Sequence, residues 1–168
     1  DKKIAFIGVT TPQTLSKSDL HNIVDENKTM VYDFLTEREG QELYETIQGY
    51  INEVREKGAK YVIILAHLGN EGDALEKYTS NGLLSHINGV DAILDGHSHR
   101  NYSVTSKDKD GKDVYVVQTG TKLNYIGAIK ISTDGNISSK LISEVPKPEN
   151  EEEAMKIARG DKERWVDA

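Results

Sequence analysis

The sequence predicts an α/β fold in which parallel strands come first and an antiparallel meander follows. Three apolar runs, separated by a helical pattern and by polar stretches, lie in the first part of the chain. Four short segments broken by turn residues come after them. A strand–helix–strand order favours a parallel sheet with right-handed crossovers, whereas short strands joined by turns favour antiparallel pairing.

The parallel strands are predicted from three runs that are apolar on both faces: Lys3–Val9, Tyr61–Ala66 and Val90–Leu94. Strands that are covered on both faces have this pattern. Between the first two, Glu37–Lys57 carries apolar residues at helical spacing and is followed by Gly58, a residue typical of a helix end. Leu83–Ile87 predicts a short helix before the third strand. Thr14–Asp33 is polar with scattered apolar residues, which predicts irregular structure.

The antiparallel part is predicted by four strands separated by turn clusters: Tyr102–Thr105, Val114–Gln118, Ile126–Ser132 and Ile137–Ser143. We expect this meander to cover much of the sheet face opposite the helices. Pro146 and Pro148 end it, and Glu149–Arg159 predicts a helix. The sequence therefore divides into a domain over residues 1–145 and a linker or terminal helix over residues 146–168.

Bulk composition excludes several classes of protein. A chain of 168 residues with 36% hydrophobic and 29% charged residues can form one folded domain with a core. The net charge of −7 argues against nucleic-acid binding, which needs a basic surface. No apolar run has the length of a membrane-spanning helix, and no signal peptide is visible in this chain. The absence of cysteine excludes disulfides and thiolate metal sites.

Three histidines stand just past the ends of the predicted second and third strands. They are His67 in Ala66-His67-Leu68-Gly69, and His97 and His99 in Asp95-Gly96-His97-Ser98-His99. Imidazole is a common ligand for zinc, manganese and iron. Ligands and chemistry gather at the carboxyl ends of strands in open α/β sheets. We therefore predict that these three rings converge on a metal site, in contrast to His21 and His86, which lie in polar or helical contexts.

Other polar and aromatic residues near these motifs leave alternatives open. Asp95 is a metal ligand, a second-shell partner that orients an imidazole, or the cap of the turn that begins at Gly96. Gln118–Thr121 is a substrate-facing turn or a plain hairpin turn. Tyr102 and Tyr125 stack on a nucleobase or pack in the core.

Taken together, these motifs resemble the calcineurin-like metallophosphoesterases, and within them the 5′-nucleotidase and 2′,3′-cyclic-nucleotide phosphodiesterase branch. The resemblance runs from about Lys2 to Ser143. It rests on five segments in matching order and approximate spacing: Ile7–Pro12, Ala66–Gly69, Asp95–His99, Gln118–Gly120 and Tyr125–Gly127.

The resemblance implies a centre of two divalent metal ions, such as zinc, manganese or iron. His67 and His97 match histidines that bind one ion, His99 matches the ligand of the other, and Asp95 is assigned to the second shell. A metal-bound hydroxide would attack the phosphorus of a nucleotide or another phosphate ester. The resemblance also implies an extracytoplasmic location.

The family's first three motifs precede the segment that matches Lys3–Pro12, and none of them appears in this chain. Those motifs supply the bridging aspartate, further metal ligands and the histidine that assists the leaving group. We therefore expect half of a metallophosphoesterase β-sandwich flanked by helices, with an apolar patch that docks the missing N-terminal half or a second copy. Such a chain is expected to be inactive alone. The alternatives are a non-catalytic half-domain fragment or a metal-binding module without turnover.

Overall fold

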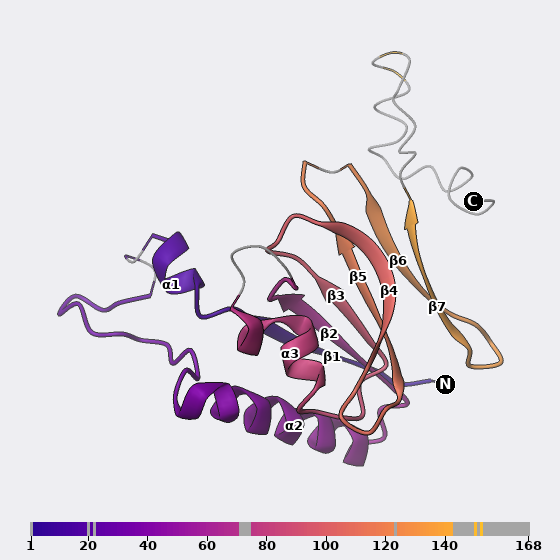
Figure 1. Ribbon diagram of the computed structural model, residues 1–168, viewed down its shortest axis with the longest axis horizontal. Coiled ribbons are helices and arrows are strands. Elements are labelled where there is room, and N and C mark those ends of the chain that lie inside the picture. Colours follow the sequence, from indigo (N-terminus) through magenta and orange to yellow (C-terminus); the bar gives the residue numbers. More distant parts are fainter. Residues whose placement is uncertain are drawn as a thin grey trace.

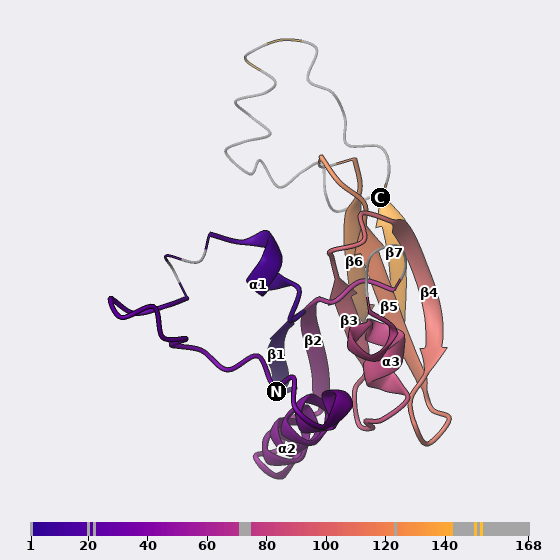
Figure 2. The same ribbon diagram turned by 60° about the vertical axis from the view of Figure 1, so that its left-hand side comes forward.

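The computed structural model describes residues 2–19, 21, 23–70, 75–122, 124–142, 150 and 152. It confirms the α/β fold class. A five-stranded sheet carries helices on one face and a separate two-stranded hairpin on the other (Figures 1 and 2). No helix in these ranges combines the length and the apolar character that crossing a lipid bilayer requires.

The main sheet has the strand order β1-β2-β3-β5-β4. Its strands are β1 (Ile4–Thr10), β2 (Tyr61–His67), β3 (Ala92–Asp95), β4 (Asn101–Lys107) and β5 (Asp113–Thr119). Strands β1, β2, β3 and β5 run parallel, while β4 pairs antiparallel with β5 at one edge of the sheet. The parallel strands therefore end on the same side of the sheet, where the loops after β1, β2 and β3 come together.

The helices are α1 (Thr14–Lys17), α2 (Gln41–Glu56) and α3 (Ser80–Leu84), with short 3-10 helices η2 (Arg38–Gly40) and η3 (Glu76–Tyr78). Helix α2 packs its apolar stripe against β1 and β2, and the buried residues of that stripe are Leu43, Tyr44, Ile47 and Ile51. Gly58 ends this helix as predicted, with a φ of 85° that glycine adopts without strain.

Two predicted helices and one segment predicted to be irregular need correction. Helix α2 begins at Gln41 rather than Glu37, because Glu39 and Gly40 have positive φ and cannot continue an α-helix. Helix α3 spans Ser80–Leu84 rather than Leu83–Ile87, because the Thr79 side chain accepts a hydrogen bond from the Gly82 amide and caps an earlier start. The segment Thr14–Asp33, predicted to be irregular, contains the single turn of α1.

The four later strands exist as predicted, but they do not form one meander. Strand β5 pairs parallel with β3, so β4 and β5 extend the main sheet. Strands β6 (Ile126–Ile131) and β7 (Ile137–Ile142) form the separate hairpin. A Cβ added at Gly127 would lie 2.8 Å from a Val117 methyl carbon, so glycine lets β6 pack directly on β5 (Figure 2).

The two faces of the main sheet are covered unequally. Val62 and Ile64 point toward α2 and are fully buried, within a cluster that runs from Ile7 to Val116. On the opposite face, Phe6 and Leu65 are 59% and 45% exposed. The β6–β7 hairpin covers part of this face, where Tyr61, Ile63 and Val117 are buried, and Phe6 and Leu65 remain as the apolar patch expected from the sequence. Because β4 and β5 join the main sheet, the β6–β7 hairpin packs on the β5 side and leaves these β1 and β2 side chains open.

The predicted linker or terminal helix over residues 146–168 lies outside the described residues, apart from Asn150 and Glu152.

The unequal cover of the sheet can be tested with two neighbouring residues of β2. Ile64→Ala should lower the free energy of unfolding by about 2–5 kcal/mol, because it leaves a cavity against α2. Leu65→Ala, one residue along and on the open face, should cost less than about 1 kcal/mol, since its side chain already contacts water. Urea unfolding of both variants measures the difference, and equal losses would contradict the open face.

Candidate metal centre

The sheet brings two of the three predicted histidines into contact. His67 is the last residue of β2, and His97 lies two residues after the end of the neighbouring strand β3. The Nε2 atom of His67 lies 3.3 Å from the Nδ1 atom of His97, and the ring centroids are 5.0 Å apart at an angle of 63°. A Cβ at Gly96 would lie 3.1 Å from Nδ1 of His67, so this glycine makes room for the ring.

His99 does not join this pair in a three-ligand group. In the ranges that the structure describes, no three His, Asp or Glu side chains are arranged to hold one metal ion. His99 is exposed, and its backbone has a φ of 55°. His97 also has a positive φ, of 84°, a region that non-glycine residues adopt rarely and mostly where the surroundings impose it.

The buried carboxylate of Asp95 joins the loop that carries His97 to the loop that follows His67. Its Oδ1 atom accepts hydrogen bonds from the backbone N–H groups of Leu68, Gly69 and Gly96, at 2.7–3.1 Å. Its Oδ2 atom accepts one from the Ser80 hydroxyl at 2.7 Å. Asp95 thus fixes the start of the turn after β3 and the loop after β2 at the same time.

Gln118 holds the rest of the His97 loop from the neighbouring strand β5. Its side chain is fully buried, and its Nε2 atom donates to the Gly96 carbonyl at 3.0 Å. Its Oε1 atom accepts from the Arg100 amide and the Ser98 hydroxyl, at 2.8 and 2.9 Å. Gln118 therefore braces the turn from inside the protein, and these contacts do not support the substrate-facing alternative for this residue.

Tyr102 belongs to the same network. Its hydroxyl accepts hydrogen bonds from Gln118 Nε2 at 3.2 Å and from Asn70 Nδ2 at 2.9 Å. The half-buried ring packs against the core cluster. Of the two alternatives for Tyr102, packing is the one that these contacts support.

Sequence reasoning missed Gln13, which lies in the loop after β1. Its Oε1 atom lies 2.8 Å from Nε2 of His97, on the far side of the ring from His67. The loop is tied to β2 by a hydrogen bond of 3.0 Å from the Thr11 amide to the His67 carbonyl. The available signal was its position, since it follows a parallel strand at the same edge as the two histidine loops.

Electrostatics favour the neutral form of His97. Burial and the neighbouring ring of His67 lower the pKa of His97, and Asp95 opposes the shift only in part. A neutral ring is the form that binds metal, because a protonated nitrogen has no lone pair to donate.

The pair fits two positions around one metal ion. Two nitrogens at about 2.0–2.1 Å from a tetrahedral zinc ion lie about 3.3–3.4 Å apart, which matches the 3.3 Å between His67 Nε2 and His97 Nδ1. The donors are uncharged imidazoles, a common set for zinc and related metals. Two ligands leave the coordination shell incomplete, so further ligands have to come from elsewhere.

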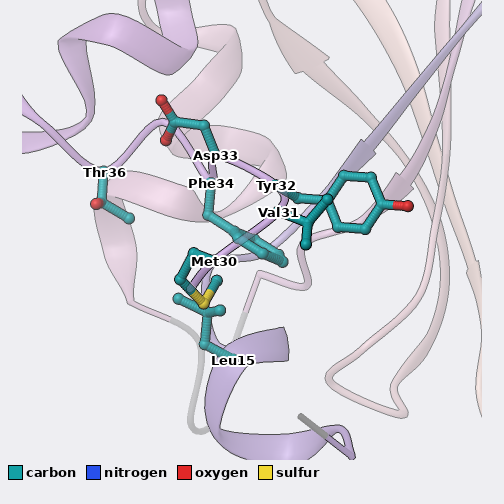
Figure 3. Close-up of a pocket in the computed structure, with 7 residues that line it drawn as sticks. All are labelled: Leu15, Met30, Val31, Tyr32, Asp33, Phe34 and Thr36. Atoms are coloured by element: carbon teal, nitrogen blue, oxygen red, sulfur yellow. The ribbon is translucent and has the colours of Figure 1, made fainter. Parts of the chain in front are cut away.

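A cavity of about 420 Å³ lies next to α1 (Figure 3). It is lined by Leu15 of α1 and by residues of the segment before α2, Met30, Val31, Tyr32, Asp33, Phe34 and Thr36. Neither His67 nor His97 lines it. Because imidazole nitrogens are metal ligands, we place the candidate metal site at the histidine pair and not in this cavity.

Comparison with known proteins confirms the resemblance over part of the chain. A 2′,3′-cyclic-nucleotide 2′-phosphodiesterase/3′-nucleotidase from Salmonella typhimurium is 35% identical over 101 residues, and one from Haemophilus influenzae is 30% identical over 102 residues. The cell wall protein Lmo0130 from Listeria monocytogenes is 31% identical over 112 residues. Each match covers 58% of this chain, which spans 13% of the length of these curated relatives. No protein-family model matches the chain.

Solved structures show the same fold. A 5′-nucleotidase precursor from Thermus thermophilus matches 84% of this chain and 28% of its own, with a TM-score of 0.59 and 23% identity. The sulfate thiohydrolase SoxB from the same organism matches 95% of this chain and 27% of its own, with a TM-score of 0.52 and 19% identity. The chain therefore shares its fold with this 5′-nucleotidase precursor and with SoxB, and two of the relatives that match by sequence are named as nucleotide phosphodiesterases.

The role of Asp95 can be tested by removing its carboxylate. Asp95→Ala should lower the free energy of unfolding by about 3 kcal/mol or more, because three backbone N–H groups lose their acceptor. Amide hydrogen exchange at positions 68, 69 and 96 should accelerate. Asp113→Ala, which removes an exposed carboxylate paired with Lys107, should change stability by less than about 1 kcal/mol. A loss below about 1 kcal/mol for Asp95→Ala would contradict the assignment.

Proposed function

We propose that this chain is the C-terminal part of the catalytic domain of a two-metal phosphohydrolase that cleaves phosphate esters of nucleotides. The observation that carries the proposal is the His67–His97 pair, which lies at the carboxyl edge of a sheet with the fold of a 5′-nucleotidase. The names of two relatives, both 2′,3′-cyclic-nucleotide phosphodiesterases with 3′-nucleotidase activity, support the substrate class.

In this proposal His67 and His97 bind one divalent ion and His99 belongs to the second. The contact between the first two rings supports their shared ion, while His99 is exposed and joins no three-ligand group among the described residues. When bound, such ions polarise phosphoryl oxygens and lower the pKa of water, so that a nucleophile exists near neutral pH.

The chain's own residues contribute ligands and rigidity rather than proton transfer. His67 and His97 present nitrogen lone pairs, while Asp95 and Gln118 fix the loops that carry them. The bridging aspartate and the histidine that assists the leaving group are assigned to the part of the protein outside this chain. Alone, the chain is therefore expected to bind metal weakly and to lack turnover.

The partner proposed for the open sheet face is that missing N-terminal part of the catalytic domain. Phe6 and Leu65 leave an apolar surface beside β1 and β2, and the relatives are several times longer than this chain. A second copy of the chain is the alternative occupant. The cell wall name of one relative supports an extracytoplasmic location for the whole protein.

The function is tested in the full-length protein that contains this segment. It should release phosphate from nucleoside monophosphates or open 2′,3′-cyclic nucleotides in the presence of Mn²⁺ or Zn²⁺, and chelation should abolish this activity. His97→Ala should lower kcat by at least about 100-fold, because it removes a metal ligand.

His86→Ala is the matched control, since that histidine stacks on Tyr44 at 4.0 Å and is expected to have no role in catalysis. Wild-type rates in the His97→Ala protein would overturn the assignment. Robust metal-dependent turnover of p-nitrophenyl phosphate by the isolated chain would overturn the half-domain proposal.

A further inference from the structure

We propose that Gln13 is a positioning residue that fixes the tautomer and orientation of His97, so that its Nδ1 lone pair faces His67. The inference concerns the metal-free chain, and its consequence for metal affinity rests on the proposed function. Gln13 lies outside the two histidine motifs, in the loop after β1.

The contact between Gln13 and His97 determines which ring nitrogen of His97 carries the proton. The Oε1 atom of Gln13 lies 2.8 Å from Nε2 of His97. An amide oxygen only accepts hydrogen bonds, so Nε2 of His97 has to carry the proton. In a neutral imidazole the other nitrogen, Nδ1, is then a bare acceptor.

The second contact of the ring agrees with this tautomer. Nδ1 of His97 faces Nε2 of His67 at 3.3 Å. If Nδ1 of His97 is the acceptor, Nε2 of His67 is the donor, and the hydrogen bonds run in one direction from His67 through His97 to Gln13. If the Nε2 proton of His67 moves to its own Nδ1 atom, the two facing nitrogens would both offer lone pairs, and His67 and His97 would hold a metal ion as neutral rings.

Gln13 is itself held in place. Thr11 is buried, and its backbone N–H donates to the His67 carbonyl at 3.0 Å. The Thr11 hydroxyl accepts a hydrogen bond from the backbone N–H of Gln13 at 3.3 Å. Gln13 is the N-cap of α1, and its backbone carbonyl accepts from the Ser16 N–H at 3.0 Å. The backbone of Gln13 is therefore held in place relative to the end of β2.

Partners of this kind have measurable effects in metal sites. A ligating histidine usually donates its other ring N–H to an oxygen acceptor, and loss of that acceptor weakens metal binding by about 10–100-fold. Asp95 does not supply this acceptor here, because both of its oxygens are engaged with Ser80 and with backbone N–H groups. Gln13 takes that role instead.

The experiment uses the isolated chain without metal and reads the ring nitrogens of His97 by ¹⁵N NMR, at a pH above the range in which histidine titrates. A His97→Asn variant assigns the signal. The wild type should show the Nε2–H tautomer with a proton that exchanges slowly. In Gln13→Met, which keeps the side-chain length but has no oxygen, that proton should exchange much faster. Gln13→Glu, which only accepts, should restore its protection. Gln41→Met makes the same change at an exposed position of α2 and should alter nothing at His97.

An Nδ1–H tautomer in the wild type, or equal protection in the wild type and Gln13→Met, would overturn the inference. Failure of Gln13→Glu to restore protection would also overturn it, because the amide nitrogen would then be the group that matters. Zn²⁺ titration by calorimetry supplies a separate readout, with about 10–100-fold weaker binding expected for Gln13→Met. If the wild type binds no Zn²⁺, the metal role proposed for this chain falls, while the tautomer result stands on its own.

Discussion

The buried carboxylate of Asp95 is the constraint on which the candidate centre depends. His67 ends β2 and His97 lies in the loop after β3, and Asp95 links that loop to the one that follows His67. By accepting three backbone N–H groups and one hydroxyl, Asp95 fixes both loops with a single side chain. Buried charge is costly without such partners, so the carboxylate and the loop conformation stabilise each other.

Gln118 completes this arrangement from the other side. Asp95 and Gln118 are paired positions of β3 and β5, so their side chains reach the same loop from two parallel strands. Between them, His97 and His99 adopt positive φ angles that cost of order 1–3 kcal/mol each for such residues. The strain is sustained because hydrogen bonds at Gly96, Ser98 and Arg100 determine the loop on both sides of each histidine.

The sequence allowed the strands to be predicted from local patterns, and the meeting of His67 with His97 from the expectation that the two strands lie in one parallel sheet. Apolar runs mark the buried strands, and parallel strands carry their following residues to one edge. The insertion of β5 beside β3 could not be predicted, because strand order depends on pairing between distant segments. The roles of Gln13 and Gln118 were hidden for the same reason: a polar side chain reveals its partner only once the register of the sheet is known.

The same topology explains why the centre is incomplete within the described residues. Two imidazoles come from β2 and the loop after β3, and the sheet face on their side carries exposed apolar residues at Phe6 and Leu65. Further ligands could reach the pair from protein docked over that face. A partner on the open face would therefore both bury the apolar surface and approach the two histidines.

The most direct test of the account is a crystal structure of this chain soaked with Zn²⁺, with data collected on both sides of the zinc absorption edge. We expect an anomalous peak bonded to Nε2 of His67 and Nδ1 of His97, at about 2.0–2.1 Å from each nitrogen. Zinc bound only to other side chains, or no zinc at this pair after the soak, would contradict the central claim that these two rings bind one ion.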